Sequence, residues 1–278
     1  MHNQSPVSTN TEKLIHPLAS IHPDAQIAPD VRIDAFVTIQ KDVVIGEGCW
    51  IGSNAVIQEG ARIGKHCKIF PGAVISTIPQ DLKYQGEYTT CEIGDYTTIR
   101  EYATVNRGTS WSGKTVVGNH VLLMAYVHVA HDCVIGDHAI LTNACNLAGH
   151  VVIEEYARLG GMSAVHQFVH IGKHVMVQGG SLVMKDVPPY AMAGRRPLRY
   201  MGVNSVGLKR SGLSPEEINH IQDIYRTVYG SGNSNKGVQR VEAEIRQTEA
   251  RDEILNWIRN SKRGIIKGPG NAQFDEED

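Results

Sequence analysis

The stretch IGEGCWIGSNAVIQEGARIGKHCKIF, residues 45–70, has an isoleucine at every sixth position. The spacing extends in both directions, since ten successive sixth positions from Ile21 to Ile75 are all isoleucine. An aliphatic residue holds the same register further along the chain, at Ile93, Ile99 and Val105 and without a break from Val117 to Val183. Such regularity indicates a repeat architecture, in which each short unit packs only on its neighbours.

The geometry of a β-strand explains the six-residue period. A small or β-branched residue stands four positions after each of the first nine isoleucines, at Ala25, Val31, Val37, Val43, Cys49, Ala55, Ala61, Cys67 and Ala73. This residue and the next isoleucine are two apart, so on a strand both point to the same face. The remaining residues make a turn. Three such sides form a coil of 18 residues, with successive coils stacked ~4.8 Å apart as parallel strands. The pattern predicts an all-β solenoid around an aliphatic column.

The cysteines follow the same register. All five occupy the inward position two residues before an aliphatic residue, at Cys49, Cys67, Cys91, Cys133 and Cys145. Cysteine in such a place behaves as a small hydrophobic residue. We therefore expect buried free thiols rather than disulfides or metal ligands.

The repeat also divides the chain. We expect a disordered N-terminus at 1–18 and a coil at 19–190, interrupted by loops at 76–92 and 109–115. A linker and a C-terminal α-helical domain should follow at 191–267. There Ser214, Pro215 and Glu217 have the pattern of a helix start, and three helices should extend to about residue 262. Residues 268–278 are predicted to be an acidic disordered tail.

Bulk properties narrow the functional classes. The formal net charge is −2, which gives no general attraction to nucleic acid. The polar N-terminus lacks the apolar segment of a secretory signal, and no apolar run approaches the ~18 residues that cross a bilayer. These features predict a soluble cytoplasmic protein that makes no stable membrane insertion.

The stretch VHVAHDCVIGDH, residues 127–138, concentrates ionisable side chains. His131 falls on a turn, at an exposed corner of the predicted prism, with Asp132 beside it and His150 about one coil further on. An imidazole next to a carboxylate is the arrangement of a general base held in one tautomer. Two alternatives remain open: solvated surface histidines, and a zinc site shared between subunits. His138, also at a corner, has no carboxylate partner in this pattern.

Several motifs resemble the UDP-N-acetylglucosamine 3-O-acyltransferase family, which makes the first acyl transfer of lipid A synthesis. They are QDLKY (80–84), REYATVNRGT (100–109), AHDC (130–133), LAGH (147–150), GGMSAVHQF (160–168), HVMVQGG (174–180), DVPPY (186–190) and GVNSVGLKRSG (202–212). Their order and spacing cover roughly residues 19–265. The resemblance implies that the coil is a left-handed parallel β-helix of hexapeptide repeats, followed by a C-terminal helical domain.

The resemblance also implies roles for individual residues. His131 matches the general base, Asp132 its orienting partner, and Gly149 the backbone N–H that faces the oxyanion. The implied substrate-binding residues are Gln80, Asp81, Lys83, His128, His150, Gln167, Asn204 and Arg210. Gly179 matches the end of a hydrocarbon ruler. It lies 48 residues beyond His131, which is ~13 Å along the column, and we expect a preference for long 3-hydroxyacyl chains.

The implied reaction needs no metal and no cofactor, because the acyl donor is carried on the phosphopantetheine of acyl carrier protein. A homotrimer is expected, since flat-sided prisms close in a three-fold ring, with each active site at a cleft between subunits. The segment 187–215 has five basic residues and no acidic one, which suits an acidic carrier protein: Arg195, Arg196, Arg199, Lys209 and Arg210. Asn106 and Val206 depart from residues found in some members, both at the expected substrate periphery.

Three other functions are considered. A related N-acyltransferase acts later in the same pathway, but that family has a sizeable extra domain before its coil, whereas the repeat here begins by Ile21. A zinc carbonic anhydrase and a scaffold without activity share the hexapeptide fold. Metal analysis and an acyl-transfer assay separate these possibilities.

Overall fold

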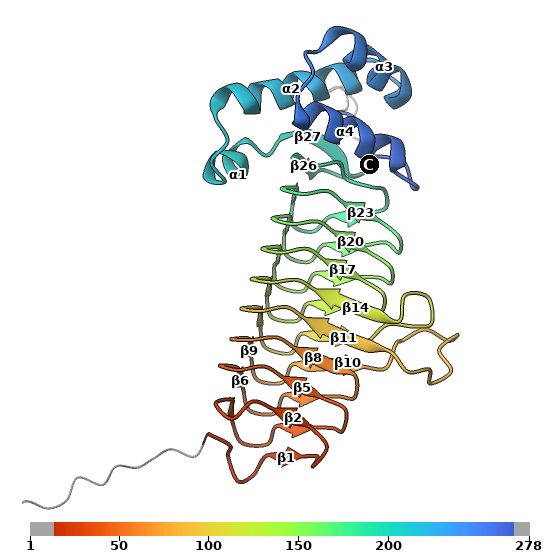
Figure 1. Cartoon of the computed structure of the whole chain (residues 1–278). Helices are drawn as coiled ribbons and strands as arrows, with labels where there is room; N and C mark the ends of the chain where they lie inside the picture. The colour runs from red at the N-terminus through yellow and green to blue at the C-terminus, as the bar shows by residue number, and fades with distance from the viewer. Residues whose placement is uncertain (1–13, 270–278) are drawn as a thin grey trace, which may run out of the picture.

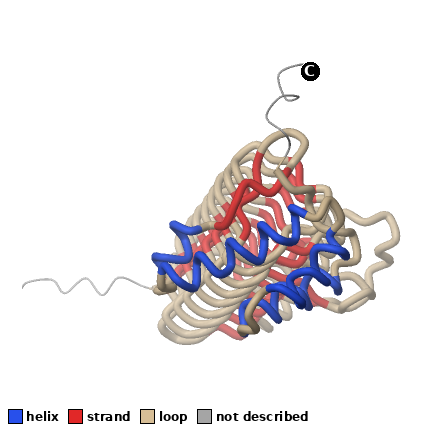
Figure 2. The backbone as a smooth tube through the Cα atoms, turned by 90° about the horizontal axis from the view of Figure 1, so that it is seen from above, coloured by secondary structure: helices blue, strands red, loops and turns tan. Residues whose placement is uncertain are grey.

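Short parallel strands stack into a three-sided column with helices at its C-terminal end (Figure 1). The structure is a computed structural model and describes residues 14–269. Each strand pairs with the strand one coil later, as in the pairing of Val129 with Leu147. Figure 2 shows the coils stacked one behind another, with helices over the end of the column.

Each side of the column is one sheet, and up to the last coil every third strand in the sequence belongs to it. The nine-stranded sheet contains β1 (Ser20–Ile21), β4 (Thr38–Ile39), β7 (Val56–Ile57), β10 (Val74–Thr77), β13 (Thr104–Asn106), β16 (His128–Val129), β19 (Asn146–Leu147), β22 (Ala164–Val165) and β25 (Leu182–Val183). The eight-stranded sheet contains β2 (Gln26–Ile27), β5 (Val44–Ile45), β8 (Ala61–Ile63), β11 (Thr90–Ile93), β14 (Lys114–Val117), β17 (Val134–Ile135), β20 (Val152–Ile153) and β23 (His170–Ile171). The ten-stranded sheet contains β3 (Arg32–Ile33), β6 (Trp50–Ile51), β9 (Lys68–Ile69), β12 (Thr98–Ile99), β15 (Leu122–Leu123), β18 (Ile140–Leu141), β21 (Arg158–Leu159), β24 (Met176–Val177), β26 (Ala191–Gly194) and β27 (Arg199–Val203).

The interior of the column confirms the inward register. The hexad isoleucines Ile51, Ile57 and Ile69 are fully buried, as are their counterparts in the later coils. All five cysteines are free and buried, and burial raises the pKa of the Cys133 thiol to about 12. These thiols therefore pack as hydrophobic residues.

Turns between the sheets form three edges of the prism. The first edge joins the nine- to the eight-stranded sheet at 130–132, 148–150 and 166–168. The second joins the eight- to the ten-stranded sheet at 136–138, 154–156 and 172–174. The third returns to the nine-stranded sheet at 142–144, 160–162 and 178–180. The last residue of a turn is commonly left-handed, as Asp132 (φ 58), His138 (φ 59) and Ala144 (φ 58) show.

A ladder of stacked rings lines the second edge. Adjacent centroids lie 4.7 to 5.9 Å apart along His66, Tyr96, His120, His138, Tyr156, His174 and Tyr190. Rings at equivalent turn positions of successive coils meet at about the spacing of the strands. His120 and His138 therefore belong to a structural stack on a different edge from His131.

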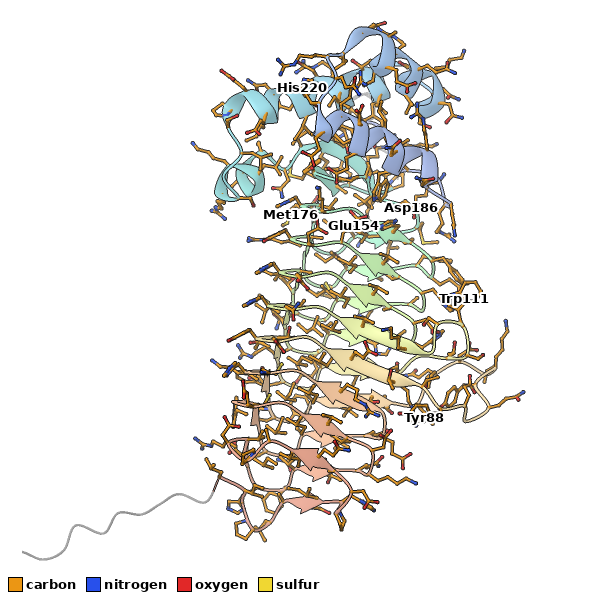
Figure 3. The ribbon with its side chains drawn as sticks, viewed as in Figure 1. Tyr88, Trp111, Glu154, Met176, Asp186 and His220 are labelled. Atoms are coloured by element: carbon orange, nitrogen blue, oxygen red, sulfur yellow. The ribbon has the colours of Figure 1, made fainter. Side chains whose placement is uncertain are left out.

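Two loops leave the column at the first edge (Figure 1). They span 78–89 and 107–113, so the first is shorter than the predicted segment, and the second has the predicted length but begins two residues earlier. The difference arises because the flanking strands pair with each other into the loop bases, Thr77 with Asn106 and Thr90 with Lys114. Both loops, marked by Tyr88 and Trp111 in Figure 3, project on the same side.

The chain ends need two corrections. Residues 14–18 were expected to be disordered, but Ile15 forms a parallel bridge with Ile33, because the first coil offers an unpaired strand edge. Residues 191–203 were expected to be a linker, yet β26 and β27 form an antiparallel hairpin that continues the ten-stranded sheet. The remainder of the predicted termini, 1–13 and 270–278, lies outside the described residues.

Four helices follow the hairpin: α1 (Ser205–Arg210), α2 (Pro215–Gly230), α3 (Ser234–Glu244) and α4 (Glu249–Asn260). The predicted start at Ser214 is confirmed, since its side chain and that of Glu217 form a capping box. The short helix α1 was not predicted. Over residues 14–269, no helix combines the length and apolar character that a bilayer crossing requires.

Polar contacts attach the helices to the last coils. Trp257 Nε1 donates to Glu154 Oε1 at 2.9 Å, and Ser261 Oγ donates to Asp186 Oδ2 at 2.7 Å. The buried Asp186 also accepts from the backbone N–H of His170 at 2.8 Å. Glu154 and Asp186 lie at this junction in Figure 3. These bonds hold α4 on the end of the column.

Candidate active site

The first edge brings His131 and Asp132 together. His131 Nδ1 lies 2.7 Å from Asp132 Oδ2, and the two side chains are 13% and 0% exposed. An ionised carboxylate only accepts hydrogen bonds, so Nδ1 carries the hydrogen and Nε2 keeps its lone pair. This is the arrangement that general-base catalysis needs.

Asp132 is enclosed by the loop at 107–113. Thr109 donates its N–H to Oδ1 at 3.0 Å and its hydroxyl to Oδ2 at 2.7 Å. Ser112 donates its hydroxyl to Oδ1 at 2.5 Å and its N–H at 3.3 Å. Burial by itself raises the pKa of Asp132, but hydrogen bonds from Ser112, His131 and Thr109 outweigh it and lower that pKa to about 2. The carboxylate is therefore ionised at neutral pH.

Gly149 lies against the imidazole of His131. A Cβ at this position would be 2.5 Å from His131 Cε1 and 2.7 Å from Nε2, far inside van der Waals contact. The N–H of Gly149 donates no hydrogen bond to any described residue. A free backbone donor beside the free nitrogen of a base is suited to stabilise negative charge that develops there.

His150 forms an aromatic wall beside the pair. Its ring stacks on Phe168 at 4.3 Å and meets His131 edge to face at 5.0 Å, while Trp111 contacts His150 at 5.3 Å. His150 Nδ1 is 3.8 Å from Asp132 Oδ2 and has no hydrogen-bond partner in the described structure. Burial lowers the pKa of His150 despite the nearby carboxylate. A neutral ring beside the His131 pair can contact substrate.

His128 and Gln167 lie near the same edge. His128 projects from β16, where its Nδ1 is 2.8 Å from Thr104 Oγ1, and burial lowers its pKa. Gln167 is exposed on the turn after β22, and its carbonyl oxygen is 3.0 Å from His166 Nδ1. The charge of His131 acts on His128, so His128 lies near the pair, whereas Gln167 is on the same edge two coils further along.

The loop at 78–89 brings further polar groups to this edge. Asp81 Oδ1 accepts the N–H of Lys83 at 2.9 Å, while Gln80 and the side chain of Lys83 are exposed. The carboxylate of Asp81 acts electrostatically on His150, so this part of the loop lies near the ring. Glu87 joins the two loops by accepting the N–H of Ser110 at 3.0 Å.

The position of Asn106 differs from the predicted one. It was expected at the substrate periphery, but its side chain is fully buried and donates to the carbonyl of Ile78 at 2.9 Å. Because the pairing of Thr77 with Asn106 closes the loop base, this residue anchors the loop instead. Val206, the second departure, is 62% exposed on α1.

The remaining predicted site residues lie on other edges of the same chain. Gly179 is exposed on the third edge, after β24. Asn204 and Arg210 line a pocket of about 410 Å³ on the second edge, together with His174. Asn204 caps α1 by accepting the N–H of Gly207 at 3.1 Å, and it donates to the carbonyl of His174 at 2.9 Å. One chain therefore does not bring all predicted residues together.

The basic residues of 187–215 are also divided. Arg196 donates to the carbonyl of Gly180 at 3.3 Å near the third edge, and Arg199 donates to that of Gly268 at 3.4 Å. Lys209 and Arg210 end α1 on the second edge and are exposed.

A metal ion would find three donors at the first edge. Ligand atoms of His131, Asp132 and His150 lie within 4.8 Å of one another. However, the Asp132 carboxylate already accepts hydrogen bonds from Thr109, Ser112 and His131, which occupy both of its oxygens. A metal would have to displace these donors, so the geometry favours a hydrogen-bonded carboxylate over a ligand.

Sequence reasoning did not find Thr109, Ser112, Trp111 and Phe168. For the first three, the available signal was the loop that breaks the repeat at 109–115, since such loops concentrate functional residues. Phe168 lies instead on a first-edge turn, one coil after His150. Trp111 is 72% exposed and meets Phe168 at 5.9 Å.

Two family models match the chain, one in the C-terminal part and one in the coil. The family model described as Udp N-acetylglucosamine O-acyltransferase; Domain 2 matches residues 186–266. The model described as bacterial transferase hexapeptide (six repeats) matches 42–77 and 114–149.

Curated relatives and a solved structure are similar over most of the chain. An acyl-[acyl-carrier-protein]–UDP-N-acetylglucosamine O-acyltransferase of Gloeothece citriformis is 46% identical over 176 residues, 63% of this chain and 64% of the relative's length. The protein of the same name from Thiobacillus denitrificans is 42% identical over 202 residues, 72% of this chain and 78% of the relative. The crystal structure of LpxA, a UDP-N-acetylglucosamine acyltransferase from Bacteroides fragilis, aligns with a TM-score of 0.88 at 48% identity, covering 91% of this chain and 100% of that one. The left-handed parallel β-helix with C-terminal helices is thereby confirmed.

Proposed function

This chain belongs to the UDP-N-acetylglucosamine O-acyltransferase family, and from that premise we propose that it moves a 3-hydroxyacyl chain from acyl carrier protein to the 3-hydroxyl of UDP-N-acetylglucosamine. This is the first step of lipid A biosynthesis, and we place it in the cytoplasm. One observation carries the proposal: His131, held by Asp132 through Nδ1, turns Nε2 toward Gly149, whose N–H is free.

The reaction follows from this geometry. The sugar hydroxyl attacks the carbonyl carbon of the thioester while its proton passes to His131 Nε2, a contribution of about 10²–10⁴-fold. Asp132 stabilises the imidazolium that forms. The oxygen of the tetrahedral intermediate accepts a hydrogen bond from the N–H of Gly149, which a rigid coil holds in place. The intermediate then expels the phosphopantetheine thiolate, and this sulfur takes the proton from His131. No covalent enzyme intermediate forms.

We further propose that the reaction needs neither metal nor cofactor. Both oxygens of the Asp132 carboxylate already accept hydrogen bonds, so this carboxylate is not free to bind a metal. The acyl group arrives on the phosphopantetheine of its carrier protein. The exposed basic residues Arg196, Lys209 and Arg210 are suited to attract that acidic protein.

The sugar nucleotide is proposed to contact two groups of residues. Gln80, Asp81 and Lys83 belong to the loop at 78–89, which brings Asp81 near His150, while His128, His150 and Gln167 lie at the first edge. Asn204 and Arg210 line the pocket on the second edge, where a guanidinium suits a diphosphate or the groups near it.

The test is direct. Purified protein is incubated with UDP-N-acetylglucosamine and 3-hydroxyacyl carrier proteins, with and without a chelator. The masses of the products are then measured by mass spectrometry. We expect one ester-linked acyl group on the sugar and no effect of chelation. Acylation only of UDP-3-O-acyl-glucosamine would assign the later N-acyltransfer instead, and loss of activity on chelation would overturn the metal-free mechanism.

We propose a homotrimer, because the predicted residues occupy different edges of one chain. In a three-fold ring, the Gly179 and Arg210 that serve a given His131 belong to a neighbouring chain. Sedimentation at micromolar concentration should give a trimer. A monomer contradicts this arrangement.

Mixed trimers test the shared site. His131→Ala and Arg210→Ala chains, each of low activity alone, are expected to regain activity when co-expressed. About a quarter of the sites then combine an intact His131 with an intact Arg210 from its neighbour, if the chains mix at random. If both residues act within one chain, no intact site forms and activity stays low.

Gly179→Met should shift the preference for acyl length. The φ of Gly179 is not left-handed, and the tight turn depends on Gly180 (φ 70) instead, so a side chain at 179 is compatible with the backbone. Its Cβ would lie 3.1 Å from the carbonyl oxygen of Gly161, which requires a small adjustment. Each buried methylene contributes ~0.8 kcal/mol, so blocking three shifts the ratio between long and short donors more than tenfold. Transfer rates for donors of graded length measure this, and an unchanged length profile places the ruler elsewhere.

A further inference from the structure

The environment of Asp132 is provided by a loop that the repeat does not require. Asp132 adopts φ 58 at the end of a first-edge turn, and its N–H donates to Thr115 Oγ1 at 2.8 Å. The next two coils place His150 and Phe168 at the equivalent positions, without any such set of donors. The coil alone therefore does not fix the orientation of the Asp132 side chain. The loop at 107–113 fixes it.

Two loop residues fix the plane of the carboxylate. The Thr109 hydroxyl and His131 Nδ1 both lie 2.7 Å from Oδ2, on which their hydrogens converge. The Ser112 hydroxyl and the N–H of Thr109 hold Oδ1 at 2.5 and 3.0 Å. With both oxygens tethered, the carboxylate cannot turn away from the imidazole without breaking charge-assisted hydrogen bonds.

We propose that Thr109 and Ser112 are positioning residues for the transfer reaction: their hydroxyls hold Asp132 so that His131 keeps its hydrogen on Nδ1 and leaves Nε2 free as the base. This inference rests on the proposed function and deepens it. Neither hydroxyl touches the reacting atoms; both act through Asp132 on His131.

A purely structural role for the two hydroxyls predicts something else. Thr109 Oγ1 also accepts the N–H of Trp111 at 3.2 Å, and Ser112 Oγ lies 2.8 Å from the carbonyl of Lys114. If these bonds only fold the loop, their loss should change substrate binding or stability and leave the imidazole as it is. The loop is also tied down independently, since the N–H of Thr90 donates to the carbonyl of Gly113 at 3.0 Å.

Three variants separate the two roles. Ser112→Ala removes the hydroxyl of an exposed residue, Thr109→Val replaces a hydroxyl by a methyl of similar size, and the double variant removes both. Ser112→Thr retains a hydroxyl. Ser110→Ala is the matched control in the same loop, because the Ser110 side chain makes no hydrogen bond in the described structure. Melting temperatures establish that each variant is folded, and Ser112→Ala suffices if a Thr109 variant is not.

We expect kcat to fall roughly ten- to hundredfold in each single variant, the range of one hydrogen bond to a charged group, with KM unchanged. The double variant should lose more, up to the whole general-base contribution of about 10²–10⁴-fold. Ser112→Thr should recover most of the kcat that Ser112→Ala loses, and Ser110→Ala should match the wild type. Wild-type kcat in both single variants would overturn the proposal, as would a change confined to KM.

A readout without substrate keeps this test independent of the proposed reaction. In protein labelled with ¹⁵N-histidine, the imidazole nitrogens report which of them carries the hydrogen, and His131→Ala identifies the resonances of His131. We expect a single Nδ1–H tautomer in the wild type and a mixture in Ser112→Ala and the double variant. Unchanged His131 resonances overturn the positioning role even if activity falls. Absence of acyl transfer by the wild type would instead refute the proposed function, while the tautomer measurement would still decide the role of the loop.

Discussion

His131→Ala is expected to lower the rate of acyl transfer by about 10²–10⁴-fold, the whole contribution of a general base. His131 Nε2 lies 2.7 Å from where a Cβ of Gly149 would stand. The melting temperature should stay close to that of the wild type, because His131 stands on an edge outside the aliphatic column and its loss opens no core cavity. Transfer assays at saturating donor and thermal melts measure the two quantities.

His120→Ala is the matched control. Its ring stacks between Tyr96 and His138 on the second edge, so the variant also removes an imidazole from a turn of the coil. We expect it to keep wild-type activity. The reverse result, an active His131→Ala protein, would show that another group accepts the proton.

Gly149→Ala should cost about 10²–10³-fold in kcat, because it displaces the imidazole of the general base. The new Cβ would be 2.5 Å from His131 Cε1, so the ring must move, and its 2.7 Å bond to Asp132 is then strained or broken. The φ of Gly149 is not left-handed, so alanine fits the backbone and the protein should fold.

A double variant shows whether the two changes act on one group. If Gly149→Ala acts chiefly by displacing the imidazole, it should add little to His131→Ala, since residues that act as a unit are not additive. Losses that multiply would mean that the added methyl group acts independently of His131, by shifting the backbone N–H that alanine retains. A folded Gly149→Ala protein with full activity would contradict the close packing of Gly149 on the imidazole.

The column was predictable because its buried aliphatic residues recur at every sixth position of the sequence. Each hexad aliphatic such as Ile57 must point inward, and the spacing of six leaves one arrangement of strands and turns that achieves this. The first elements that follow the last six-residue repeat were not predicted. After Pro189 no hexad marks the hairpin of β26 and β27, and the six residues of α1 are too few to show a helical pattern.

The candidate site was predictable only in part. His131 and Asp132 are neighbours in sequence, and the turn places both at an edge. Thr109 and Ser112 reach Asp132 from more than a full coil away, and their loop has no repeat from which a register follows. The burial of Asn106 depends on how the base of the other loop closes, which local sequence does not determine.

The spacing of residues along the chain also indicates which edge of the column each residue occupies. Residues on one edge of an unbroken coil differ by about 18, and the interval from His131 to Gly179 is two coils and two further sides. The two residues therefore stand on different edges, and an estimate of distance along the column alone understates their separation within one chain.

This separation has a consequence for how such an enzyme changes over generations. The base, its carboxylate and the loop that encloses them depend on one edge, whereas Gly179 is exposed on another and touches none of them. With Gly179 as the ruler that we propose, a lineage can alter the lipid it makes by one substitution at position 179 while the chemistry stays under unchanged selection. The acyl length of the product and the catalytic chemistry can then evolve independently within one polypeptide.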